Sequence, residues 1–343
     1  MLCLLSPAKT LAEASCGSVA SAPATLLAGA TGSLVRRCGL LSRAELKKLF
    51  AVSDALAALN HARFAAFAAQ PLFRPAAKLF DGPAFKALNA GAMREADLLA
   101  LDCHLVVLSG LYGLVRPGDA VRPYRLEMGT KLDVEGHSSL YDFWAAHGLT
   151  DCLLAHARSV DAHTVVNVAS QEYAKVVDMA ALRARGLRVL DVEFVKSGGG
   201  AVASVYAKQA RGMVARFVAM TRCTEVGVLE QFTGTKGNFA FSRKLSKPDR
   251  LVFEMSAKPA GPGDEKLFAA LLAKAAPLPK REPADRPAGA LAEAPQAAPA
   301  AKRATKRTVA GADTANTNAA AAESADADSP RAKRRRRAPG AAH

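Results

Sequence analysis

The alternation of apolar and polar positions predicts an α/β chain in which short apolar strands are separated by amphipathic helices. Apolar runs that end at turn residues are typical of buried strands. Three such runs end at Ser6-Pro7, Ser109-Gly110 and Ala169-Ser170. The predicted strands are 1–5, 104–108, 164–168, 187–195, 202–206, 239–241 and 251–255.

Helices are predicted where apolar residues recur at a spacing of three and four. Ser42 and Glu45 have the spacing of a capping box, and a helical stripe continues from Leu46. The segment 12–41 is rich in Ala, Ser, Gly and Thr, and we expect an irregular loop there. Strands that alternate with helices indicate a compact α/β body with a mixed sheet. The predicted helices are 43–57, 60–69, 84–90, 94–102, 140–157 and 207–222.

The composition changes abruptly past Pro277, where Ala, Pro, Thr and Asp dominate and large apolar residues nearly vanish. Such a segment cannot bury enough apolar surface to offset the entropy of ordering it. The sequence therefore predicts an α/β domain at 1–276 and a disordered, basic, Ala/Pro-rich tail at 277–343.

The net charge of +15 and the pI near 9.8 indicate a polyanionic partner, such as nucleic acid or an acidic membrane surface. Residues 1–276 carry +9, and residues 331–343 carry +6. A dense basic run is typical of a nuclear localisation signal or a nucleic-acid-binding patch. The alternative is a charged end that only aids solubility. The run contains Lys333, Arg334, Arg335, Arg336 and Arg337.

The sequence has no cofactor or metal motif. Its six cysteines are at least 13 residues apart and its seven histidines lack metal-ligand spacing, which disfavours a zinc site or a redox pair. The first ten residues lack the basic region of a signal peptide, and no apolar run approaches the ~18 residues of a membrane span. We expect a cytoplasmic protein with reduced thiols, no cofactor and no membrane contact.

Polar side chains follow three of the predicted strands. If these strands are parallel, their carboxyl ends share one edge of the sheet, where ligand sites of α/β proteins form. The alternative is that all three are ordinary strand-to-helix connections. The candidate pocket residues, which extend into later loops and a helix, are Ser6, Lys9, Ser109, Tyr112, Arg116, Tyr124, Arg125, Glu127, Asn167, Ser170, Glu172, Tyr173, Lys208 and Arg211.

Two later segments add arginines to these candidates. The loop 116–129 is stiffened by prolines, and its arginines present planar forks that suit phosphate or carboxylate. The alternative is a local ion pair between Arg125 and Glu127, which contributes little if exposed. Lys208 and Arg211 lie beside the apolar stripe of the helix at 207–222, where they line an anionic groove or form an ordinary solvated face.

Six sequence blocks occur in a fixed order: LLSPAKT, LSGLYG, PYRLEMG, YDFW, NVASQEY and YAKQARG. Together they resemble the signature blocks of the bacterial YaaA family of peroxide-stress proteins, over about residues 1–256. The resemblance implies a compact mixed α/β body of its own type without a cofactor motif. It also implies DNA binding and a role in limiting iron-driven damage during peroxide stress. Bacterial-type members end near residue 256, so the added tail suggests a eukaryotic setting and a nuclear import receptor as partner.

The resemblance further implies a helix-hairpin-helix-like element at 42–69. A hairpin glycine in such elements lets the backbone approach a phosphate closely. Ala58 stands where we expect that glycine, which places the backbone contact in doubt but leaves side-chain contacts open. The DNA-binding candidates of this element are Arg43, Lys47, Lys48 and Arg63.

Three hypotheses follow. The first is a DNA-binding protein of the peroxide response, with non-specific DNA as partner. The second is an enzyme that processes a nucleotide or base in a basic pocket, with a small anionic ligand. The third is a closed internal network of polar groups without chemistry. An open basic pocket favours the second, and a basic stripe outside it favours the first.

Overall fold

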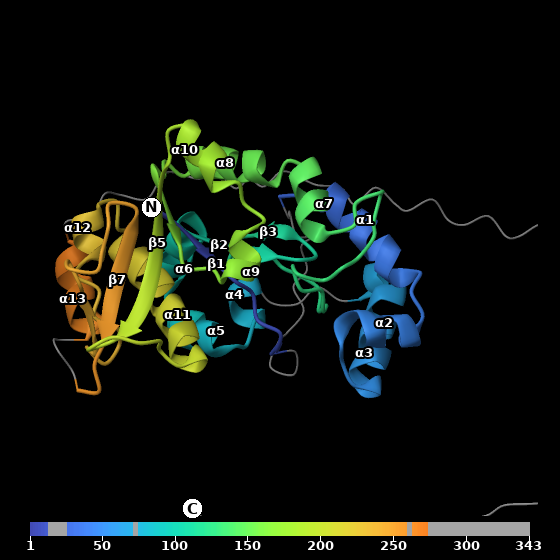
Figure 1. Cartoon of the computed structure of the whole chain (residues 1–343), viewed down its shortest axis with the longest axis horizontal. Helices are drawn as coiled ribbons and strands as arrows, with labels where there is room; N and C mark the ends of the chain where they lie inside the picture. Colours follow the sequence, from blue (N-terminus) through green and yellow to red (C-terminus); the bar gives the residue numbers. More distant parts are fainter. Residues whose placement is uncertain (13–25, 71–74, 259–262, 274–343) are drawn as a thin grey trace, which may run out of the picture. The chain divides into compact units, whose positions relative to one another are not determined.

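The computed structural model describes residues 1–12, 26–70, 75–258 and 263–273, and it confirms the mixed α/β class (Figure 1). The predicted disordered tail at 277–343 lies outside these residues. The described strands form one seven-stranded sheet with the order β3-β2-β1-β4-β5-β7-β6. The strands are β1 (Leu2–Leu5), β2 (Leu105–Ser109), β3 (Gly113–Val115), β4 (Thr164–Asn167), β5 (Arg188–Lys196), β6 (Phe239–Phe241) and β7 (Arg250–Met255).

The centre of the sheet is parallel. Strand β1 pairs in parallel with β2 and β4, in the registers Cys3 to Leu105 and Leu2 to Val165. Strands β4, β5 and β7 continue the parallel pairing, and β3 and β6 close the two edges in antiparallel fashion. Every residue of β1 and β2 is buried, which explains why Leu2–Leu5 and Leu105–Leu108 are continuous apolar runs without alternation.

Helices pack against the sheet and against each other. Helices α6 and α11 contact β1, while α8, α9 and α10 contact β3, β2 and β5. Helix α11 also packs along α5, and Figure 1 shows the two side by side. The helices are α1 (Ala28–Gly39), α2 (Arg43–Phe50), α3 (Asp54–Ala65), α4 (Ala76–Leu79), α5 (Pro83–Leu88), α6 (Glu95–His104), α7 (Leu140–Ala146), α8 (Leu149–Ser159), α9 (Gln171–Ala174), α10 (Met179–Ala184), α11 (Ser204–Thr221), α12 (Val226–Leu229) and α13 (Asp264–Leu272).

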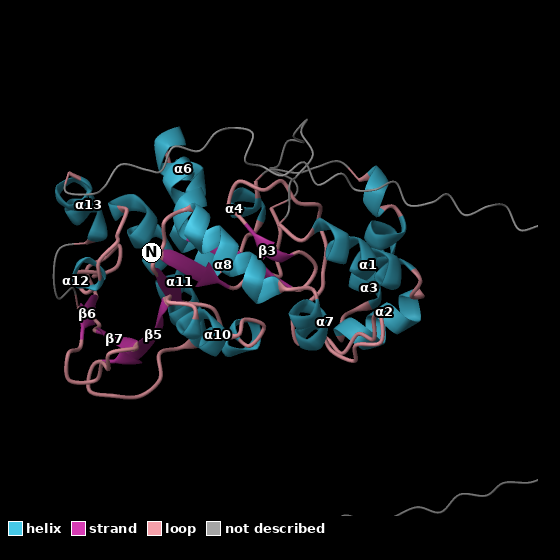
Figure 2. Cartoon of the chain, turned by 90° about the horizontal axis from the view of Figure 1, so that it is seen from above, coloured by secondary structure: helices cyan, strands magenta, loops and turns pink. Residues whose placement is uncertain are grey.

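The predicted loop at 12–41 is wrong over its second half, where α1 forms. Its buried residues include Ala30, Leu34 and Cys38, which follow each other at helical spacing. This stripe is difficult to recognise in the sequence, because alanine and threonine contribute little to an apolar pattern. Helix α1 packs on α3, and Figure 2 shows α1, α2 and α3 gathered together.

The predicted break between the next two helices is also misplaced. Helix α2 ends at Ala51, which adopts a left-handed conformation with φ 50°. Helix α3 then begins after Ser53, whose hydroxyl accepts a hydrogen bond from the Leu56 N–H. Ala58 therefore lies inside α3, and Ala51 is the residue in the turn where glycine is favoured.

Two further predictions need correction. The single helix at 140–157 is two helices, α7 and α8, because Gly148 adopts a left-handed conformation with φ 69°. The strand at 202–206 does not form, since α11 already begins at Ser204. The antiparallel strand β3 was not predicted.

Five cysteines lie in the described segments, and all five are free thiols. Four of them are buried, in agreement with the expected reduced state. Among the described residues, no helix combines the length and the apolarity that crossing a membrane requires.

Candidate functional site

The sheet brings the carboxyl ends of three predicted strands together, as the sequence predicts. Ser6 follows β1, Ser109 ends β2 and Ser170 lies just after β4, and the three strands are parallel neighbours. The chain passes from β1 to β2 on one side and later returns to β4 on the other side. This reversal makes a crevice at the carboxyl ends of the strands, the usual place for a ligand in an open α/β sheet.

A pocket of about 280 Å³ opens at this reversal point. Its walls come from the loop after β1, the start of α5, the start of α9 and one face of α11. Half of the fourteen predicted pocket residues line it, namely Ser6, Lys9, Ser170, Glu172, Tyr173, Lys208 and Arg211. The other lining residues are Leu5, Pro7, Ala8, Thr10, Gly82, Pro83, Ala84 and Phe85.

Two glycines allow the elements around the pocket to pack closely. A side chain at Gly212 would place its Cβ 1.9 Å from the carbonyl oxygen of Ala84, so α11 packs directly on the backbone of α5. A Cβ at Gly82 would come 2.9 Å from the Cβ of Ala8, which brings the loop after β1 against the start of α5. The walls are therefore packed closely at both glycines, against backbone at Gly212 and against the alanine methyl at Gly82.

The cations at the pocket fall into two groups. Lys9 is 63% exposed and pairs with Glu127 at 2.6 Å, and Arg125 donates to the same carboxylate at 3.0 Å. The local Arg125–Glu127 ion pair is thus present, extended by Lys9. Lys208 and Arg211 form no ion pair or hydrogen bond with any residue in the described part of the chain. Burial lowers the pKa of Arg211.

Hydroxyl and carboxylate groups complete the pocket wall. The Ser6 hydroxyl accepts the backbone N–H of Ser170 at 2.8 Å and donates to the Ser170 hydroxyl at 3.2 Å. Glu172 accepts the N–H of Gly129 at 3.0 Å, which ties the pocket to the 116–129 loop. Burial raises the pKa of Tyr173, so this phenol stays protonated at neutral pH.

Ser109, Tyr112 and Tyr124 do not line the pocket and form a closed network instead. The Ser109 hydroxyl lies 2.6 Å from the Tyr124 hydroxyl and accepts the N–H groups of Leu111 and Tyr112. The Tyr112 hydroxyl accepts the Arg122 N–H at 3.0 Å. Burial raises the pKa of both tyrosines, so they are neutral. This network joins the LSGLYG and PYRLEMG blocks, and its polar groups serve packing.

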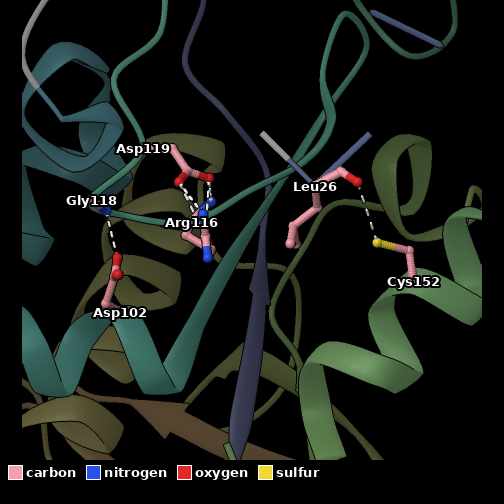
Figure 3. Close-up of polar contacts among 6 residues, drawn as sticks. All are labelled: Leu26, Asp102, Arg116, Gly118, Asp119 and Cys152. Atoms are coloured by element: carbon pink, nitrogen blue, oxygen red, sulfur yellow. Dashed lines mark hydrogen bonds and ion pairs between the residues drawn. The ribbon is translucent and has the colours of Figure 1, made fainter. Parts of the chain in front are cut away.

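Arg116 and Asn167 are also engaged away from the pocket. Arg116 and Asp119 are buried, and their side chains pair at 2.8 Å (Figure 3). Burial works against the charge on Arg116, but the Asp119 carboxylate outweighs it and the pKa of Arg116 is raised. Asn167 donates to Asp191 at 2.7 Å and accepts the N–H of Ala169 at 3.1 Å.

A second basic surface lies on the pair of helices α2 and α3. A broad groove of about 840 Å³ is lined by Arg43, Lys47 and Lys48, and Lys47 pairs with Asp54 at 2.8 Å. Arg63 does not line this groove and donates to Asn60 within α3.

The groove on α2 shares Lys48 with a second groove. This second groove, of about 590 Å³, is lined by Arg37, Lys131 and again Lys48. Sequence reasoning missed Arg37 and Lys131, because each is a single cation on a different element and only the fold brings them beside Lys48. We refer to Arg37, Arg43, Lys47, Lys48 and Lys131 as the basic track.

Comparison with known proteins places these features in one family. A family model described as "Peroxide stress protein YaaA" matches residues 1–245, which include the pocket and the basic track. A UPF0246 protein of Ruegeria pomeroyi is 39% identical over 258 residues, which cover 74% of this chain and 98% of the relative. A UPF0246 protein of Roseobacter denitrificans is 41% identical over 217 residues, which cover 62% of this chain and 83% of the relative.

Proposed function

Because this chain belongs to the YaaA family of peroxide stress proteins, we propose that it binds DNA without sequence preference during the response to peroxide. The family assignment supports the peroxide response. The DNA contact is our proposal, and with it the limitation of iron-driven damage, since a protein that covers DNA shields it from radicals formed nearby.

The basic track is the observation that carries this proposal. Lys48 lines both grooves, so the cations of α1, α2 and the loop after Gly129 border two grooves that share this lysine and are also lined by Glu45, Asp54 and Asp133. Lysine and arginine side chains that neutralise phosphates bind DNA in a sequence-independent, salt-dependent manner. The Ala51 turn between α2 and α3 lies in the same groove. We therefore propose contacts from side chains, without the backbone contact that a hairpin glycine would add.

The tail is proposed to strengthen this binding. Its run Lys333–Arg337 concentrates positive charge, and such a run also suits a nuclear import receptor. On this proposal the protein works in the cytoplasm and enters the nucleus where the tail is recognised.

A salt-dependent DNA titration tests the basic track. Removing two phosphate contacts with Arg43→Gln and Lys48→Gln is expected to reduce the slope of log K against log salt by about 2. Lys244→Gln removes an exposed cation of the same charge outside both grooves and is the matched control. Equal slopes for the double variant and the control would mean that the basic track does not contact the DNA phosphates.

Deleting residues 277–343 tests the tail in the same assay. The six cations at 331–337 are expected to account for a slope of about −5, so the truncated protein should bind more weakly and with a flatter slope. An unchanged affinity and slope would mean that the tail does not contribute to DNA binding and acts only as a localisation signal.

A second candidate function is an enzyme that processes a nucleotide or base. The specific observation in its favour is the open pocket with two cations that the described residues leave unpaired. Incubation of the protein with nucleoside monophosphates, followed by chromatography of the products, tests for turnover directly.

A further inference from the structure

The pocket at the ends of β1 and β4 has an unbalanced positive charge. Lys208 and Arg211 stand three residues apart on α11, so their side chains leave the same face of the helix. The carboxylates around the pocket do not pair with them. Glu172, which lines the pocket, accepts the Gly129 N–H, and Glu127 holds Lys9 and Arg125. The two cations of α11 therefore lack an ion-pair partner within the described residues.

An unpaired and partly buried guanidinium is costly for the protein. Burial lowers the pKa of Arg211, which reflects the loss of water around its charge. Burying a charge without a partner is unfavourable, and a bound anion offsets this cost. The backbone contact between Gly212 and Ala84 holds α11 in place, so Arg211 cannot withdraw by a shift of the helix.

The opposite wall offers a hydroxyl donor. Ser170 Oγ accepts a hydrogen bond from Ser6, and no group in the described part of the chain accepts the proton of Ser170 itself. This hydroxyl lines the pocket together with Lys208 and Arg211. Two cations and one neutral donor, which come from different elements, thus line one small volume.

We propose that this pocket binds a phosphomonoester, with Lys208 and Arg211 on the phosphate and Ser170 as a third donor. A phosphomonoester carries a charge of about −1.5 to −2 at pH 7 and three acceptor oxygens, which matches two cations and a hydroxyl. A carboxylate or a phosphodiester carries only one charge and leaves one cation unbalanced.

The size of the pocket and its remaining walls narrow the choice of ligand. The volume of about 280 Å³ lies just below the ~300 to 1,000 Å³ of typical ligand pockets, so the organic part is compact. Pro7, Ala8 and Pro83 provide apolar wall for it. A nucleoside 5′-monophosphate has this combination of a dianionic phosphate and a flat, compact body.

Two sources supply this chemistry. One is a free nucleoside monophosphate, and the other is a DNA strand with a 5′-phosphate at its end. The second source rests on the proposed DNA binding, and the first does not depend on it.

Calorimetric titration of the full-length protein with deoxyadenosine 5′-monophosphate tests the proposal, with deoxyadenosine as the ligand control. We expect binding of the phosphate form only. Arg211→Gln and Lys208→Gln should each weaken it by about tenfold or more, while Lys244→Gln leaves it unchanged. Ser170→Ala should weaken it to a smaller extent. Equal binding of the two ligands, no binding, or equal effects of Arg211→Gln and Lys244→Gln would overturn the proposal.

A second arm distinguishes the two sources. DNA hairpins with a 5′-phosphate or a 5′-hydroxyl are compared at the same salt concentration. If the DNA end is the ligand, the phosphate raises affinity in the native protein and not in Arg211→Gln. If the free nucleotide is the ligand, both hairpins bind alike while deoxyadenosine 5′-monophosphate still binds. The variants Arg43→Gln and Lys48→Gln lower the affinity of both hairpins equally, so failure of the DNA proposal is seen separately.

Discussion

Two polar clusters lie in segments that end or follow strands of the same sheet, and they differ in how their charges and donors are satisfied. The closed cluster, which begins at the end of β2, holds two separate buried contacts: Ser109 bonds to Tyr124, and Arg116 pairs with Asp119. The pocket after β1 and β4 contains residues of the same types, but Lys208 and Arg211 have no described partner.

The difference shows that residue type and strand position do not by themselves identify a site. A buried polar group needs a partner, and either the chain or a ligand provides it. Where the chain provides every partner, the group stabilises the fold. Where it leaves a partly buried arginine unpaired in an open pocket, water or a ligand is the remaining partner. The closed cluster should therefore respond to mutation in stability, and the pocket in binding.

The largest expected effect is at the buried ion pair. Asp119→Ala removes the carboxylate that pairs with the buried Arg116, and we expect a loss of about 3 to 5 kcal/mol in the free energy of unfolding. Urea denaturation measures it. The double variant Arg116→Met/Asp119→Leu removes both charges and should recover most of the loss. A single variant that loses under about 1 kcal/mol would contradict the closed interpretation of this cluster.

The next largest effect is expected at Ser109, and its loss of stability can be compared with that at Ser170, which follows a neighbouring strand. Ser109→Ala removes a partner from the Tyr124 hydroxyl and from two backbone N–H groups, with an expected cost of about 1 to 3 kcal/mol. Ser170→Ala leaves the Ser6 hydroxyl free to turn toward the open pocket and should cost less. Thermal unfolding of both variants side by side gives the order. The reverse order would mean that Ser170 in the pocket wall contributes more to stability than Ser109 at the end of β2.

The smallest effects are expected at the cations of the pocket. Lys9 is exposed, and Lys208 has no described partner to lose, so Lys9→Ala and Lys208→Gln should change stability by no more than about ±0.5 kcal/mol. Arg211→Gln should leave the melting temperature unchanged or slightly raise it, because it removes an unpaired charge. Collapse of any of the three in a thermal melt would place these residues in a structural network.

The strand ends were predictable because physical constraints on them are local. A strand buried on both faces is mostly apolar, and the runs Leu2–Leu5, Leu105–Leu108 and Val165–Val166 of β1, β2 and β4 show this in the sequence. Helix ends were less predictable. Ala51 and Gly148 end helices through left-handed backbone conformations, and an alanine gives no sign of this in the sequence.

The candidate site was predictable in part. The conformations of the loops after β1 and β4 follow from their strands, so Ser6 and Ser170 were placed correctly at the edge. Whether an arginine pairs internally depends on tertiary neighbours. Arg116 finds Asp119 three residues away, whereas Arg211 forms no ion pair with a described carboxylate. Patterns along the sequence treat both arginines alike, and only the packing of α11 separates them.

The central position of β1 also affects how the chain folds as it is synthesised. Cys3 pairs with Leu105 and Leu2 pairs with Val165, so β1 must wait during synthesis until both partners have followed. Pairings so distant along the chain form slowly, because a long loop must close first. Until Leu105 has been synthesised, the apolar segment Leu2–Leu5 is unpaired on both edges, which exposes it to aggregation. Nascent chains stalled before Leu105 should therefore bind chaperones through this strand.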